Sequence, residues 1–249
     1  GDAATGYYNA AYNLVFSTVV ISNVLNTSLF PSLTRRAAAN DGSLQRIYER
    51  AFRYLLMISI PIAVGGSLLA HEIIPLLFSD DYLPAIPALR IVIWVVPLMF
   101  TSEFLGYVVI INGQEKRAAR SVFISTSVNV MLNLIVVPMY GFIGAAVMTC
   151  VTEMVLVGQY VWILRESFRD LNWGQLLGRP IAAAALMGIC VMVFIHLPVL
   201  ATVALGMAAY GLSLLLVGGI GAEELRFVGQ LRRLVDSRRE RMKINQDNV

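Results

Sequence analysis

Lys and Arg residues are confined to alternate polar stretches of this 249-residue chain. Seven long apolar stretches are separated by short polar ones, and eighteen of the nineteen basic residues fall in every second polar stretch. The basic stretches cover 35–53, 116–120, 165–179 and 226–243. The connections between them, at 79–86, 139–141 and 196–198, contain neither Lys nor Arg. Cytoplasmic loops of multi-pass membrane proteins carry such an excess of positive charge. The pattern predicts seven bilayer crossings, with the first residues outside and the basic tail in the cytoplasm.

Composition excludes a soluble domain. Hydrophobic residues make up 57% of the chain and charged residues 14%, whereas soluble domains have roughly 45–50% and about 25%. The basic residues flank the spans, so we expect no nucleic-acid partner. Cys150 and Cys190 lie in different spans without neighbouring ligands, which predicts no disulfide, no metal and no cofactor. No sequence motif of a hydrolase, kinase or dinucleotide-binding enzyme is present, and the chain is predicted not to be an enzyme.

The predicted fold is all-α, a polytopic bundle of seven transmembrane helices. Each apolar stretch is close to the roughly 20 residues that cross the hydrocarbon core as a helix. Helices are required because lipid offers no hydrogen-bond partners to unpaired backbone N–H and C=O groups. Pro61 and Pro97 fall inside the second and third spans, where each removes a backbone donor and predicts a hinge. The predicted spans cover 7–33, 54–78, 87–112, 121–138, 142–164, 179–197 and 199–220.

Polar side chains form a stripe on the first span and another on the fourth. The first stripe includes Asn9, Asn13 and Asn23, at spacings compatible with a helical period. The second includes Asn129 and Asn133. Amides are costly in hydrocarbon, so the stripes must face water or other helices. Two interpretations stay open for them: the wall of a water-filled cavity, and hydrogen bonding between packed helices.

Ionisable residues inside the spans are few, and such residues commonly line a substrate or ion path. Arg90, near the outer end of the third span, is predicted either to bind a phosphate bidentately or to reach the outer headgroups. Glu103, deeper in the same span, is either a proton or cation site or a hydrogen-bonded partner between helices. Glu153 in the fifth span is assigned the structural role.

Several sequence blocks resemble the polysaccharide transporter branch, which includes the O-antigen flippases, of the multidrug/oligosaccharidyl-lipid/polysaccharide flippase superfamily. The blocks cover roughly residues 6–165, and their order is more specific than any one of them. They read GYYNAAYNL from Gly6, LFPSL from Leu29, INGQEK from Ile111, VNVMLNL from Val128 and PMYGFIGAA from Pro138.

The resemblance implies a bilobed transporter of the MATE type, with six helices in each lobe and two helices added. On that template residues 1–165 are the second transport lobe without its first helix, 166–222 are two additional transmembrane helices, and 223–249 are a basic cytoplasmic tail. The resemblance therefore implies that an N-terminal lobe is required and absent. The tail suits an amphipathic helix on the membrane surface, and a solvated helix fits it nearly as well.

The function that the resemblance implies is translocation of undecaprenyl-diphosphate-linked oligosaccharide across the bacterial inner membrane by alternating access. The implied partners are this lipid-linked substrate, membrane lipids and a coupling ion, H⁺ or Na⁺. Alternatives within the superfamily are a lipid II flippase and a multidrug/cation antiporter. A drug exporter needs an acidic and aromatic cavity, and a lipid-diphosphate carrier needs a cationic one. A membrane glycan polymerase is a further alternative, against which the short external loops argue. A structural membrane scaffold is the last alternative.

Overall fold

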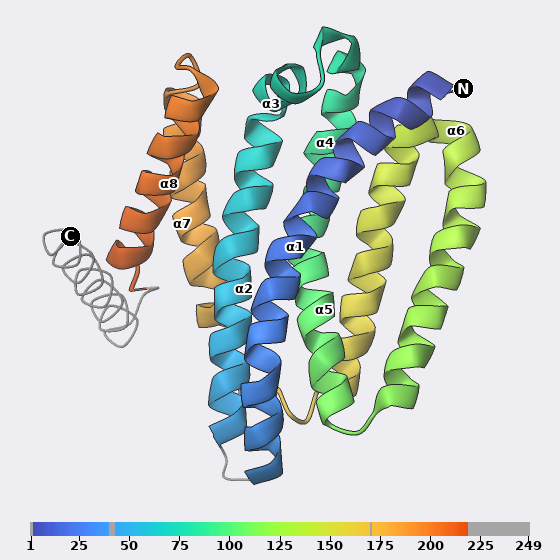
Figure 1. Ribbon diagram of the computed structural model, residues 1–249, viewed down its shortest axis with the longest axis vertical. Coiled ribbons are helices and arrows are strands. Elements are labelled where there is room, and N and C mark those ends of the chain that lie inside the picture. The colour runs from blue at the N-terminus through green and yellow to red at the C-terminus, as the bar shows by residue number, and fades with distance from the viewer. Residues whose placement is uncertain (1, 40–42, 170, 219–249) are drawn as a thin grey trace, which may run out of the picture.

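A computed structural model describes residues 2–39, 43–169 and 171–218 (Figure 1). These residues form helices joined by turns, with no strand among them, which confirms the predicted fold class. The predicted tail, 223–249, lies outside the described residues. The helices in chain order are α1 (Asp2–Ala39), α2 (Ser43–Leu68), α3 (Ala70–Leu77), η1 (Asp80–Ala85), α4 (Ile86–Val92), α5 (Val95–Ile111), α6 (Glu115–Ile163), α7 (Trp173–Val193) and α8 (Val199–Leu216).

The connections alternate between two ends of the bundle, as the charge pattern predicts. Figure 1 shows α3 and η1, the bend of α6 and the α7–α8 connection at one end, and the α5–α6 and α6–α7 connections at the other. The first end contains the stretches without Lys or Arg, and the opposite end contains Lys116, Arg117 and Arg165. The structure thus places the basic connections at one end and the connections without Lys or Arg at the other. The cytoplasmic assignment of the basic end stays a prediction.

Apolarity and length identify fewer than seven spans in the described part of the chain. Four helices pass both criteria, and a fifth crossing is added if the bent pair Asp80–Val92 and Val95–Ile111 counts as one. The predicted count of seven is therefore not confirmed. One difference is that 49-residue α6 contains the fourth and fifth predicted spans as two arms. The other is that α1 is not among the candidate spans found in the described residues.

Two breaks shape the helices. In α6 the two arms meet at Gly141, whose φ of 58° and ψ of −144° are not helical and strongly favour glycine. In the third predicted span, α4 and α5 meet at an angle of 45°. This bend lies at Ile93 and Trp94, because proline at 97 has no N–H to donate to the Ile93 carbonyl. Val96 donates to that carbonyl instead, at 3.1 Å. In contrast, α2 stays helical through Pro61.

Helix α5 lies at the centre of the bundle and packs against α1, α2 and α6. Its side chains Phe100, Phe104 and Leu105 are among the largest that are fully buried. Helix α7 packs between α2 and α8. Large apolar side chains on the first arm of α6 and on α8 stay exposed, including Phe123 at 73% and Leu200 at 80%. Such contiguous apolar exposure suits contact with lipid.

Candidate functional site: a polar cleft between α1 and the two arms of α6

A cleft of about 390 Å³ opens between α1 and the two arms of α6. Most of the side chains around it are polar, in a bundle whose surface and core are otherwise largely apolar. Its lining consists of Tyr8, Tyr12, Val122, Ser125, Thr126, Asn129, Thr149, Thr152, Glu153 and Leu156.

Hydrogen bonds join the two arms of α6 below the bend at Gly141. The Asn129 side-chain amide donates to Thr152 Oγ1 at 2.9 Å, and Ser125 Oγ donates to the Thr152 carbonyl at 2.9 Å. Asn133 in turn donates to Asn129 Oδ1 at 3.1 Å. The structure therefore brings the two predicted asparagines of α6 together. Both are half-buried, and Asn129 lines the cleft whereas Asn133 lies outside its lining.

Aromatic rings form the α1 wall of the cleft. Tyr8 stacks on Tyr12 with ring centroids 5.7 Å apart, and Tyr12 stacks on Phe16 at 6.4 Å. The hydroxyls of Tyr8 and Thr149 lie 3.0 Å apart, within hydrogen-bond distance, so this wall is tied to α6. Sequence reasoning missed these rings. Their signal was the spacing of four residues, which places them on one helix face.

Glu103 and Glu153 are half-buried, and both carboxyl groups accept hydrogen bonds from neighbouring side chains. Glu103 accepts from Ser22 Oγ at 2.5 Å and from the Asn26 amide at 3.4 Å. Glu153, which also lines the cleft, accepts from Ser102 Oγ at 2.9 Å. Ser22 and Asn26 are buried on α1. Among the described residues, Asn26 Oδ1 is one of the buried polar atoms without a hydrogen-bond partner.

The remaining predicted residues lie elsewhere. Asn9, Asn13 and Asn23 are exposed on α1, so the predicted stripe forms an exposed row. Ser22 and Asn26, which lie beside that row, are buried and meet Glu103. Arg90 is exposed in the last turn of α4 and is not part of the cleft lining. Of its polar atoms, the backbone carbonyl accepts a hydrogen bond from Ser67 Oγ at 3.4 Å. Pro61 lines a different, apolar groove.

Among the described residues of the cleft lining, Glu153 is the acidic one. The lining combines this carboxylate with two tyrosine rings, hydroxyls and an amide, and includes neither Lys nor Arg among the described residues. Hydroxyl and amide groups can exchange hydrogen bonds with sugar hydroxyls. Ring faces can cover the apolar faces of sugars or hold an organic cation. The cleft is thus suited to polar, weakly charged or cationic ligands, and its described lining does not itself offer a phosphate site.

Comparisons with known proteins confirm the resemblance to the flippase superfamily. The profile of a family described as "Polysaccharide biosynthesis protein" matches residues 1–87. A membrane protein of Methanocaldococcus jannaschii, MJ1068, is 27% identical over 130 residues, which are 50% of this chain and 25% of that protein. The "Probable low-salt glycan biosynthesis flippase Agl15" of Haloferax volcanii is 24% identical over 148 residues, which are 59% of this chain and 31% of that protein. The matches thus span about a quarter to a third of these relatives.

The fold is that of a solved flippase. The structure titled "Lipid II flippase MurJ, inward closed conformation" matches with a TM-score of 0.68 and 15% identity, covering 84% of this chain and 46% of that one. Together with the apolar helices, these matches identify a multi-pass helical membrane protein. The identity is too low for the fold match to carry ligand contacts across.

Proposed function

We propose that this chain forms the second transport lobe, residues 1–165, and two added helices of a flippase in a bacterial inner membrane. Its substrate is an oligosaccharide linked to undecaprenyl diphosphate, a repeat unit of O-antigen, exopolysaccharide or capsule, and the C-terminal tail is cytoplasmic. The observation that carries the proposal is the cleft between α1 and α6, where hydroxyls, an amide and stacked rings gather inside an apolar bundle. The similarity to a glycan biosynthesis flippase supports the substrate class.

The exposed row of asparagines on α1 forms a second polar surface, in addition to the cleft. Asn9, Asn13 and Asn23 cannot face lipid without a cost of several kcal/mol on alkane-transfer scales, and they do not face this chain's own core. We assign this face to a water-filled cavity shared with an N-terminal lobe, since this chain matches 46% of a solved flippase. Alternating access then consists of rocking one lobe against the other.

Glu103 is the residue that we assign to ion coupling. Its carboxylate accepts hydrogen bonds from Ser22 Oγ and from the Asn26 amide nitrogen, between α1 and α5. Among the described residues, the Asn26 Oδ1 of the same amide is buried without a hydrogen-bond partner. A proton on Glu103, or a Na⁺ held by its carboxylate, would neutralise the charge. Either ion changes the attraction between α1 and α5, which is the contact that rocking would alter.

A second candidate function is multidrug/cation antiport, favoured by the cleft composition. Glu153 with Tyr8 and Tyr12 is the acidic and aromatic set expected of a drug exporter, and the lining formed by the described residues lacks Lys and Arg. In the glycan flippase the diphosphate must therefore bind outside this cleft, where Arg90 and the N-terminal lobe are the candidates. Lipid II transport is the third candidate, supported by the fold match and by a sequence relative named "Probable lipid II flippase MurJ".

Complementation separates these functions. The protein containing this chain is expressed in a strain that lacks its own copy, and surface glycan and resistance to cationic dyes are both measured. Restored glycan at unchanged resistance supports the proposal. Restored resistance without glycan identifies the antiporter instead. Asn129→Ala should reduce glycan export, whereas Val130→Ala, on the exposed side of the same arm, should not.

A further inference from the structure

Pro61 leaves the carbonyl of Met57 without its usual helical partner. In an α-helix this carbonyl accepts from the N–H four residues later, and proline has no N–H. Tyr210 on α8 supplies the hydrogen bond: its hydroxyl donates to the Met57 carbonyl at 2.8 Å. The Tyr210 side chain is 9% exposed, so the bond lies inside the bundle. One helix therefore completes the backbone hydrogen bonding of another, at its proline.

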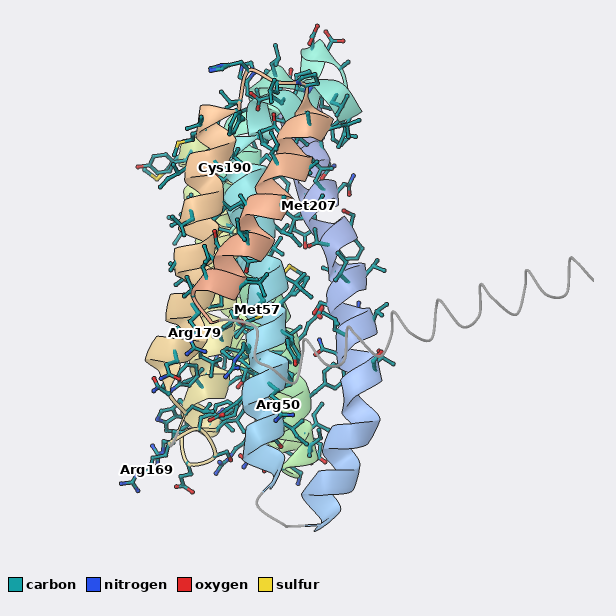
Figure 2. All side chains as sticks on the ribbon, turned by 90° about the vertical axis from the view of Figure 1, so that its left-hand side faces the viewer. Arg50, Met57, Arg169, Arg179, Cys190 and Met207 are labelled. Atoms are coloured by element: carbon teal, nitrogen blue, oxygen red, sulfur yellow. The ribbon has the colours of Figure 1, made fainter. Side chains whose placement is uncertain are left out.

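The segment of α2 beside this bond has space in which to move. A groove of about 510 Å³ is bordered by Met57, Pro61, Gly65 and Gly66 of α2 and by Tyr210 and Met207 of α8. Figure 2 shows α8 beside α2, with Met57 and Met207 labelled. Adjacent glycines weaken the helix beyond the proline. The hydroxyl of Tyr210 thus stabilises α2 at a segment that its proline and adjacent glycines make flexible.

Contact with a second bend extends the effect of this bond. A side chain on Gly66 would meet Ile93 Cγ1 at 2.8 Å, so α2 packs tightly on the residue at which α4 and α5 bend. The Ile93 carbonyl is the one that proline at 97 leaves without a helical donor. The proline segments of α2 and of the α4–α5 pair are therefore in contact, and a change in one must be accommodated by the other.

We propose that Tyr210 is a positioning residue, a latch by which α8 fixes the proline segment of α2. Through Gly66 and Ile93 the latch also sets the angle between α4 and α5. Helix α5 carries Glu103. Helix α8 thereby controls the shape of the transport lobe, whatever its substrate is. Loss of the latch frees α2 to sample other bend angles.

A double-mutant cycle with Pro61→Ala tests the latch, because the substituted alanine supplies the N–H that the Met57 carbonyl lacks. Tyr210→Phe in the wild-type background should lower the midpoint of thermal unfolding by about 2–4 °C, the usual shift for one lost hydrogen bond in a protein of this size. In the Pro61→Ala background the same substitution should cost almost nothing. Tyr160→Phe, another buried tyrosine, is the control, and its effect should be equal in both backgrounds.

Spin labels separate the latch from a merely structural bond. Labels at Arg50→Cys and His71→Cys, both exposed positions on either side of Pro61, report the bend in a protein whose Cys150 and Cys190 are replaced by serine. Tyr210→Phe should broaden the distance distribution, and Pro61→Ala should narrow it again. An equal cost of Tyr210→Phe in both backgrounds, or an unchanged distance distribution, would overturn the proposal.

Discussion

Asn129 links the two arms of α6 through Thr152 Oγ1, and its removal is the simplest test of the cleft at the scale of one residue. Asn129→Ala removes one hydrogen-bond partner from the half-buried Thr152 hydroxyl and one from the Asn133 amide. We expect destabilisation by about 1 kcal/mol, since hydrogen bonds between membrane helices average well below about 2 kcal/mol, and a larger loss of glycan export. Thermal unfolding and export are measured together. A loss of stability with full export would leave Asn129 only its packing role.

Arg90 tests where the diphosphate binds. If its guanidinium holds the phosphates, Arg90→Ala should strongly reduce surface glycan at normal protein abundance, and Arg90→Lys should restore only part of it because the planar, two-pronged donor is lost. Arg169→Ala, at the basic end of the bundle and exposed (Figure 2), is the matched control. Full export by the alanine variant would show that Arg90 serves the headgroup region alone.

At the scale of helices, Gly66 controls the contact between α2 and the bend at Ile93. Gly66→Ala places a methyl group 2.8 Å from Ile93 Cγ1, so either the Ile93 side chain or the helices must shift. We expect a loss of about 1–3 kcal/mol in the free energy of unfolding. Gly158→Ala is the matched change, since nothing lies within 4 Å of its added carbon. That variant should gain roughly 0.5–1 kcal/mol. Denaturation of both variants in one detergent checks the difference, and equal effects would contradict the tight contact.

Sequence patterns predicted the helices and the positions of their bends better than they predicted the contacts between helices. Proline at 97 predicted a bend in the third span. The bend lies at Ile93 because proline has no N–H to donate to the carbonyl four residues before it. The break between the fourth and fifth predicted spans lies at Gly141, inside the predicted connection 139–141. Periodicity could not show that the stripe with Asn23 is exposed whereas the neighbouring Asn26 is buried, because the direction of a helix face depends on which helices pack beside it. Nor could it pair Tyr8 with Thr149, 141 positions away.

For the whole molecule, the charge pattern predicts an absolute orientation that the structure leaves open. Cys introduced at Ser79, which is exposed, should react with an impermeant thiol reagent in intact cells. Cys at exposed Lys116 should react only after permeabilisation. Both variants need a background without Cys150 and Cys190. Labelling of the Lys116 variant in intact cells would invert the orientation and place the basic end outside.

The central claim is that the cleft between α1 and α6 is part of a path for lipid-linked oligosaccharide. Its most direct test reconstitutes the protein containing this chain in liposomes with a fluorescent undecaprenyl-diphosphate oligosaccharide, and follows quenching by a reagent confined to the outer solution. The wild type should expose the whole lipid pool, and an Asn129→Ala, Thr152→Val variant should expose it many-fold more slowly at equal reconstitution. Quenching that stops at the outer leaflet with the wild type, or proceeds at equal rates in both proteins, would contradict the claim.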